Sequence, residues 1–172
     1  MNLKLAEIAK EEAMKFYHGN IMGSDSNLYI ISEDFCNNDF TVDMLENCWC
    51  TVFVYYCIKR AGYKLCIKPS GVKRSLGEVG IWEQWSKLKE VNLWESDIKK
   101  PEIGDIVLFN NVFDGNNPDH IGIVVNFSSD FIETAEGNFN NVSAIVRRSY
   151  SCIRGYVRFS EIREFNSHRQ KC

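Results

Sequence analysis

The sequence predicts an α+β fold in which N-terminal helices pack on a meandering antiparallel sheet of about five strands. In the first half of the chain, apolar residues recur at the spacing of a helix. After Lys99 they gather instead into short apolar runs, which turn-forming residues separate. The links between these runs are short, and short links favour antiparallel pairing of neighbouring strands.

Length and composition indicate a globular chain. The 172 residues fit one domain with a hydrophobic core, and a hydrophobic fraction of 45% is too high for a disordered chain. We expect a single domain over residues 3–160, followed by a polar tail over residues 161–172.

Helices are expected in three stretches, at residues 3–17, 46–62 and 78–89. Residues 19–47 are rich in Gly, Asn, Asp and Ser, and they predict a long loop with one helical turn at 40–46. Five strands are expected after these helices. Residues 101–109 predict a turn followed by a strand, residues 131–138 a strand that runs into a turn, and residues 120–127, 143–150 and 153–159 the other three strands.

The helix within residues 46–62 is apolar on nearly all sides, which predicts burial. Asn47 is a good N-cap and Gly62 a suitable C-terminal glycine, so Cys50 should lie at about the third helical position. Free backbone N–H groups and the helix dipole favour a thiolate there, which makes Cys50 a candidate nucleophile. The alternative is a buried structural cysteine.

A thiol nucleophile needs a base and a group that orients the base. Of the three histidines, His120 is the best placed, because it opens a strand directly after a loop. If strands 120–127 and 131–138 pair, Glu136 or Asn138 should come near His120. Taken singly, these three residues could equally be a surface histidine, a solvated carboxylate and a left-handed turn residue.

Several segments together resemble a known family. They are WCTVFVYYCIKRAG around Cys50, IGDIVLF in the first long strand, HIGIVV at His120, EGN at Glu136 and Asn138, and the closing IRGYVRF. In this order they resemble a CHAP domain, the cysteine, histidine-dependent amidohydrolase/peptidase module of papain-like peptidoglycan hydrolases. The resemblance covers roughly residues 3–160 and implies a papain-like fold.

The resemblance also implies a mechanism. Cys50 would attack a carbonyl carbon and form a thioester acyl-enzyme, and its backbone N–H would help to bind the oxyanion. His120 would act as general base and then as general acid. Glu136 would orient the imidazole, with assistance from Asn138.

The implied substrate is bacterial peptidoglycan, cut at the N-acetylmuramoyl-L-alanine amide or at a peptide cross-link, by an enzyme of bacterial or phage origin. We assign Trp49, Asp119 and Trp82 to the substrate groove. Trp49 would pack against the site rather than react, and Trp82 could be a core residue instead.

Other functions remain open. The same thiol chemistry could serve an intracellular or secreted effector that acts on a protein or a small amide, and such an effector would have an inhibitor protein as a partner. The fold could also be a catalytically inactive binding module. We expect no cofactor and no metal. Zinc bound by Cys48, Cys50, Cys57 and His120 is disfavoured because no CxxC pair exists, and the loop oxygens of Asp25, Asn27 and Asp34 lack full EF-hand spacing for calcium.

Charge and targeting signals narrow the partners. The net charge is −3 without a basic stripe, so we expect no nucleic-acid partner. We expect a monomer with no membrane span, made in the cytoplasm without a signal peptide, because the N-terminus lacks an apolar segment. Release or export would then be needed for action on the cell wall. The odd number of cysteines suggests synthesis in a reducing compartment.

Overall fold

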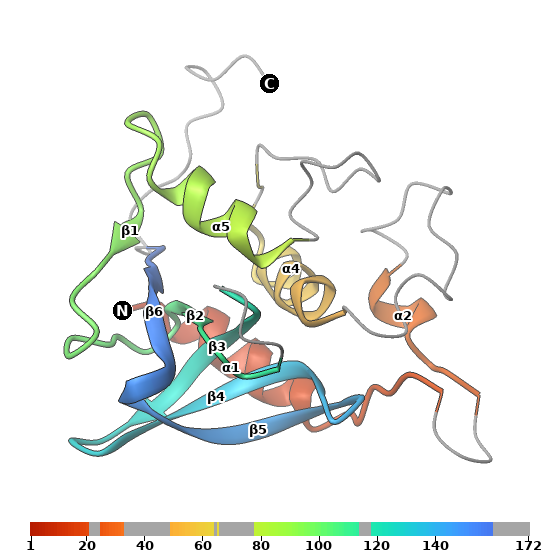
Figure 1. Ribbon diagram of the computed structural model, residues 1–172. Helices are drawn as coiled ribbons and strands as arrows, with labels where there is room; N and C mark the ends of the chain where they lie inside the picture. The colour runs from red at the N-terminus through yellow and green to blue at the C-terminus, as the bar shows by residue number, and fades with distance from the viewer. Residues whose placement is uncertain (21–24, 33–48, 64, 66–77, 114–117, 160–172) are drawn as a thin grey trace.

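The protein is an α+β structure in which helices cover one face of an antiparallel sheet (Figure 1), as the sequence predicted. The computed structural model describes residues 1–20, 25–32, 49–63, 65, 78–113 and 118–159. Within these residues the sheet has six strands in the order β1-β6-β2-β3-β4-β5. The strands are β1 Trp94–Glu95, β2 Ile106–Phe109, β3 His120–Phe127, β4 Phe131–Phe139, β5 Val142–Ser149 and β6 Ile153–Val157.

Strands β2 to β5 form the expected meander, but β6 departs from it. A short 3-10 helix, η1 (Tyr150–Cys152), turns the chain back so that β6 pairs with β2 rather than extending the sheet beyond β5. The two-residue strand β1, which the sequence did not predict, pairs with the outer side of β6. Both faces of β2 are buried, which accounts for its unbroken apolar run.

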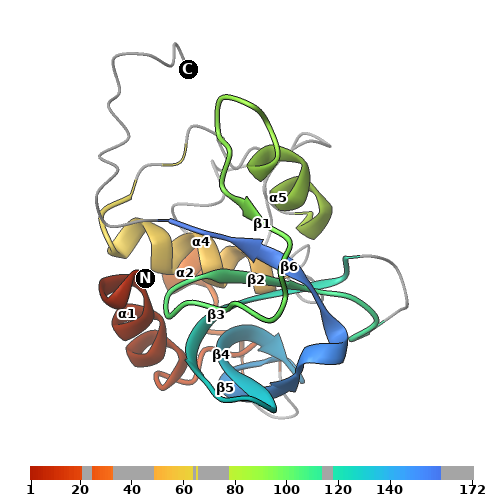
Figure 2. The same ribbon diagram turned by 90° about the vertical axis from the view of Figure 1, so that its left-hand side faces the viewer.

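The helices of the described residues are α1 Leu3–Ala13, α2 Tyr29–Ser32, α4 Cys50–Arg60 and α5 Val79–Ser86. Helices α1 and α4 pack against each other and against β3 and β4 (Figures 1 and 2). No helix in these parts of the chain is both long enough and apolar enough to cross a bilayer.

Helices α1 and α2 differ from the prediction. Helix α1 ends at Ala13 rather than at 17, because Phe16 takes a positive φ of 57° and the Tyr17 carbonyl accepts a bond from Ser143 N–H at 2.7 Å. Helix α2 lies inside the stretch expected to be loop. The turn expected at 40–46 lies outside the described residues.

Helix α4 begins later than predicted. Trp49 occupies the N-cap position, so Cys50 is the first residue of the helix rather than about the third, and Asn47 lies outside the described residues. The C-terminus is as predicted, because Gly62 has a φ of +90° and lets Tyr63 N–H reach the Ile58 carbonyl at 3.2 Å.

Two hydrophobic clusters lie on opposite faces of the sheet. Consecutive residues of a strand alternate between them, so that Ile121 and Ala135 contribute to the cluster beneath the helices, whereas Phe109 and Val124 contribute to the other. The second cluster consists of Val107, Phe109, Val124, Ile132, Tyr150, Ile153 and Tyr156. The strands that carry the candidate site therefore have defined inner and outer faces.

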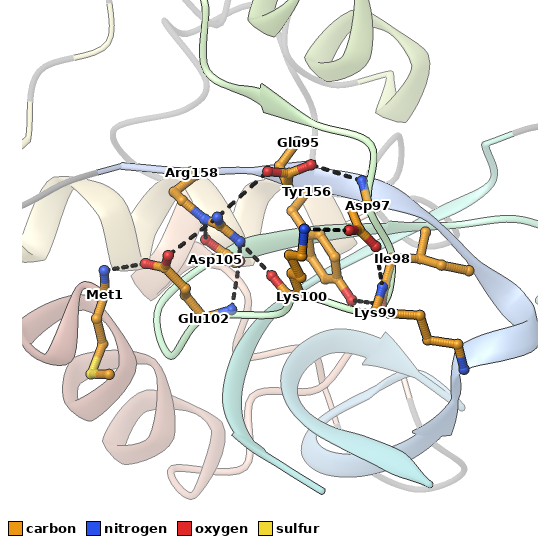
Figure 3. A network of polar contacts seen from close by, with 10 residues as sticks. All are labelled: Met1, Glu95, Asp97, Ile98, Lys99, Lys100, Glu102, Asp105, Tyr156 and Arg158. Atoms are coloured by element: carbon orange, nitrogen blue, oxygen red, sulfur yellow. Dashed lines mark hydrogen bonds and ion pairs between the residues drawn. The ribbon is translucent and has the colours of Figure 1, made fainter. Parts of the chain in front are cut away.

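A polar network fixes the end of β6 to the start of β2 (Figure 3). The buried Asp105 carboxylate accepts from Arg158 Nε at 2.9 Å and Nη2 at 2.8 Å, and also from Glu102 N–H at 2.8 Å. Burial raises the pKa of Asp105 in spite of the Arg158 guanidinium. Next to it, the Tyr156 hydroxyl donates to the Ile98 carbonyl at 2.8 Å, which holds the segment before β2 against the sheet.

Gly137 allows helix α4 to lie directly on β4. A Cβ atom at Gly137 would stand 2.4 Å from Phe53 Cβ and 2.8 Å from Trp49 Cζ3, both closer than real side chains allow. Trp49 and Phe53 flank Cys50 in the first turn of α4. This turn therefore packs against the part of β4 that follows Glu136.

We predict that Gly137→Ala lowers the free energy of unfolding by about 1–3 kcal/mol, because the added methyl group overpacks the contact between α4 and β4. Gly80→Ala, in α5, is the control, since its Cβ would meet only Pro118 Cδ at 3.9 Å and should cost nothing. Urea unfolding of both variants measures the difference. Equal stabilities would contradict the close packing of α4 on β4.

Candidate active site

Pairing of β3 with β4 brings His120 and Glu136 together. The imidazole Nε2 lies 2.7 Å from Glu136 Oε2, and both side chains are 0% exposed. Gly122 makes the approach possible, because a Cβ there would stand 2.9 Å from Glu136 Cγ. The glutamate side chain thus lies across β3 in the space that Gly122 leaves.

The Glu136 carboxylate is held by donors on three sides. Arg148 donates from Nε to Oε1 at 2.9 Å and from Nη2 to Oε2 at 2.6 Å, and Thr134 Oγ1 donates to Oε1 at 2.5 Å. Burial raises the pKa of Glu136, but the bonds from Arg148 and His120 outweigh it and bring the pKa below its usual value. Glu136 is therefore ionised at neutral pH.

An ionised carboxylate only accepts hydrogen bonds, which determines the tautomer of a neutral His120. Nε2 must carry the hydrogen that Glu136 accepts, and Nδ1 keeps a lone pair. Within the described parts of the chain, Nδ1 is buried and has no hydrogen-bond partner. Nδ1 is thus the atom of this site that is able to take up a proton.

Aromatic rings fix the plane of the imidazole. Phe109, which pairs with His120 across β2 and β3, stacks on it at a centroid distance of 6.0 Å and an angle of 22°. Phe113 meets it edge-on at 4.8 Å and 90°, although 54% of the Phe113 side chain is exposed. The imidazole consequently has one aromatic neighbour in the core and one at the surface.

Asp119, which the sequence assigned to the substrate groove, binds the backbone of Phe113. Its Oδ2 accepts from the backbone N–H groups of Val112 and Phe113, each at 2.9 Å. Its own N–H donates to the Phe109 carbonyl at 3.0 Å. Asp119 therefore sets the position of Phe113 beside His120.

Cys50 begins α4 and is 6% exposed. Helix α4 packs on the face of the sheet that carries Ile121 and Ala135, whereas His120 stacks on Phe109 at the opposite face. A thiol and an imidazole in these places would have to meet around the ends of the strands, where β3 begins and β4 ends. The pairing of Cys50 with His120 remains a prediction.

The positions of Asn138, Trp49 and Trp82 do not test their predicted roles in assisting Glu136 or lining the substrate groove. Asn138 sits at an irregularity of β4 with a φ of 62°, half-buried, as a left-handed residue would. Trp49 is fully buried, and its Nε1 donates to Asn141 Oδ1 at 3.2 Å. Trp82 is also fully buried, edge-on to Trp85. Because both indoles are buried, they could support residues that line a groove but could not contact a substrate themselves.

Several of the residues considered for metals have other roles, and two lie outside the described chain. Asn27 Oδ1 accepts from His18 N–H at 2.7 Å, and burial raises the pKa of the Cys57 thiol well above its usual value. Asp34 and Cys48 are not among the described residues. The described residues contain no group of three or more His, Cys, Asp or Glu side chains that could hold a metal ion.

The sequence reasoning missed Arg148. A signal was present, because Arg147 and Arg148 are adjacent in a strand and must project from opposite faces. One of them therefore shares a face with the buried Val146, and a buried arginine requires an anionic partner. Glu136 is that partner.

The comparison with protein families covers the segment that holds most of these residues. The CHAP domain model matches residues 42–138, more than half of the chain, and the match includes Cys50, His120 and Glu136 and ends on Asn138. The chain belongs to the CHAP domain family. Membership places it in a superfamily of amidases and peptidases associated with peptidoglycan hydrolysis. No curated protein and no solved structure matches the chain.

We predict that Glu136→Gln lowers the free energy of unfolding by about 3–5 kcal/mol at pH 7, because it leaves Arg148 without a counter-charge. The folded-state pKa of Glu136 is lowered, so its stabilisation is present above the unfolded value of about 4.3 and is lost as pH falls through the folded value. The difference in stability between wild type and variant should therefore narrow in acid.

Urea unfolding between neutral pH and pH ~3 measures this difference. Glu133→Gln is the control, since Glu133 lies on the same strand and also pairs with an arginine, Arg147 at 3.0 Å, but at the solvent face. It should change stability little. A pH-independent gap for Glu136→Gln would show that the variant acts through packing rather than through the carboxylate charge.

Proposed function

We propose that this protein is a cysteine hydrolase that cleaves an amide bond of bacterial peptidoglycan. The observation that carries the proposal is the state of His120, whose Nε2 is bound to Glu136 while Nδ1 keeps a free lone pair. Membership of the CHAP domain family supports the reaction class and the substrate.

In the proposed reaction, Nδ1 of His120 takes the proton of the Cys50 thiol as the sulfur attacks the carbonyl carbon of the amide. The tetrahedral intermediate then collapses, and the C–N bond breaks. The leaving amine receives the proton from Nδ1, and a thioester remains on Cys50. Water, deprotonated by Nδ1, attacks the thioester, releases the acid and restores the thiol.

Electrostatics favour each charge that this reaction creates. The imidazolium forms 2.7 Å from the ionised Glu136, which stabilises it and holds the ring in place. The oxyanion would form at the N-terminus of α4, which begins at Cys50, where the positive end of the helix dipole favours negative charge. A hydrogen-bond donor to an oxyanion typically lowers a barrier by about 3 kcal/mol.

The substrate would approach from the side of Phe113. This ring is exposed and borders the imidazole, so it offers an apolar surface beside the scissile bond. Asp119 would hold this surface in place, Asn138 would assist Glu136, and Trp49 and Trp82 would support the groove from below. The protein would act as a monomer after release or export from the cytoplasm.

We predict that Cys50→Ala and His120→Ala each reduce the release of peptidoglycan fragments by at least about 10³-fold, because nucleophile and base act as a unit. Cys57→Ala is the control, since this thiol is buried with a raised pKa and should not react. Digestion of purified peptidoglycan, followed by mass analysis of the fragments, measures the loss.

The same digestion names the bond. Peptides free of glycan would identify the sugar–peptide amide, and new amine termini within the peptides would identify a cross-link. An active Cys50→Ala protein would contradict the proposed nucleophile. A wild-type protein that releases nothing would contradict the proposed substrate and favour a protein or small amide instead.

A further inference from the structure

Arg148 lies on β5, outside the CHAP domain match, which ends at residue 138. Its guanidinium nevertheless contacts the carboxylate that binds His120, through two bonds of 2.9 Å and 2.6 Å. The Arg148 side chain is only 14% exposed. A buried guanidinium bound at two points fixes the orientation of the carboxylate that it binds.

We propose that Arg148 is a positioning residue of the active site and acts on His120 through Glu136. Its two-point contact fixes the orientation of the carboxylate. Its positive charge offsets that of Glu136, which by itself would favour the protonated imidazole. The inference rests on the proposed function only in the experiment that measures peptidoglycan cleavage.

The orientation follows from the donors around the carboxylate. Thr134 and Arg148 Nε bind Oε1, while Arg148 Nη2 and His120 Nε2 bind Oε2. The guanidinium itself lies over two aromatic rings, 5.3 Å from the Phe109 centroid and 5.5 Å from that of Phe139. Because Phe109 also stacks on His120, one aromatic ring sets the positions of both partners of Glu136.

The effect of Arg148 on the charge of the imidazole follows from the sequence of contacts, in which Arg148 binds Glu136 and Glu136 binds His120. A lone buried carboxylate beside an imidazole favours the imidazolium, which has no lone pair with which to accept a thiol proton. Arg148 opposes this effect because it lies against the same carboxylate. Asp119 and Cys152 also lie close to Arg148, and Cys50 of α4 would face His120 in the proposed reaction. These three groups remain unchanged in the variants below.

The test is an NMR titration of the His120 imidazole, which needs no substrate. The chain has three histidines, so a His120→Asn spectrum assigns the signal. Arg148→Met should raise the pKa of His120 by about one unit, and Glu136→Gln should lower it by a similar amount. The double variant, which lacks both charges, should lie between the two single variants.

Two further variants separate charge from packing. Arg148→Lys keeps the charge, so the pKa of His120 should stay near its wild-type value even if kcat falls through a misaligned carboxylate. Arg147→Met removes the exposed arginine that binds Glu133 and should leave the pKa of His120 unchanged. In the pH profile of peptidoglycan cleavage, the acid limb should shift upward in Arg148→Met alone.

An unchanged pKa of His120 in folded Arg148→Met protein would overturn the proposal. If Arg148→Met does not fold, the His120 pKa is compared between Glu136→Gln and the double variant. Glu136→Gln leaves the Arg148 charge unopposed, and the double variant removes that charge as well. Equal His120 pKa values in those two would overturn the proposal as well. A wild-type protein that fails to cut peptidoglycan would affect the proposed function but not this titration.

Discussion

The hydrogen bond between His120 and Glu136 is the interaction on which the site depends. Burying an ionised carboxylate is costly unless other groups replace the hydration that it loses. Here Arg148, Thr134 and His120 together supply four donors to the two oxygens. The carboxylate can therefore remain ionised in the interior, and this in turn leaves the lone pair of His120 on Nδ1.

The fold provides this arrangement through a few close approaches. Gly122 leaves room for the Glu136 side chain to cross β3, and Gly137 leaves room for the first turn of α4 on β4. Both glycines lie within the β3–β4 hairpin. Larger residues would separate the acid from the base or the helix from the sheet, so the backbone spacing of β3, β4 and α4 and the chemistry of the site depend on each other.

Much of this could be predicted from the sequence, because the signals are local. The strands around His120 and Glu136 are apolar runs bounded by turn formers, and their short link dictated a hairpin and thus the neighbourhood of the two residues. The return of β6 to β2 could not be predicted, since it depends on pairing between distant segments. The start of α4 was misplaced because Asn47 is a good N-cap by type, whereas the helix begins only at Cys50.

Burial was the other property that the sequence left undecided. The spacing of Trp82 suits a groove wall as well as a core, and only the packing of α5 buries it completely. Arg148 was overlooked because a charged residue near a strand end is usually solvated. Its role follows from the face on which it projects, which becomes certain only once the register of β4 and β5 is known.

The central claim is that the Cys50 thiol and the His120 imidazole form one titrating unit. It is tested most directly by the pH dependence of Cys50 alkylation with iodoacetamide, followed by mass spectrometry of the Cys50 peptide in wild type and His120→Ala. The account predicts that Cys50 of the wild type reacts well below the ordinary thiol pKa of about 8.5 and that His120→Ala loses this reactivity. The same pH dependence in both proteins would contradict it.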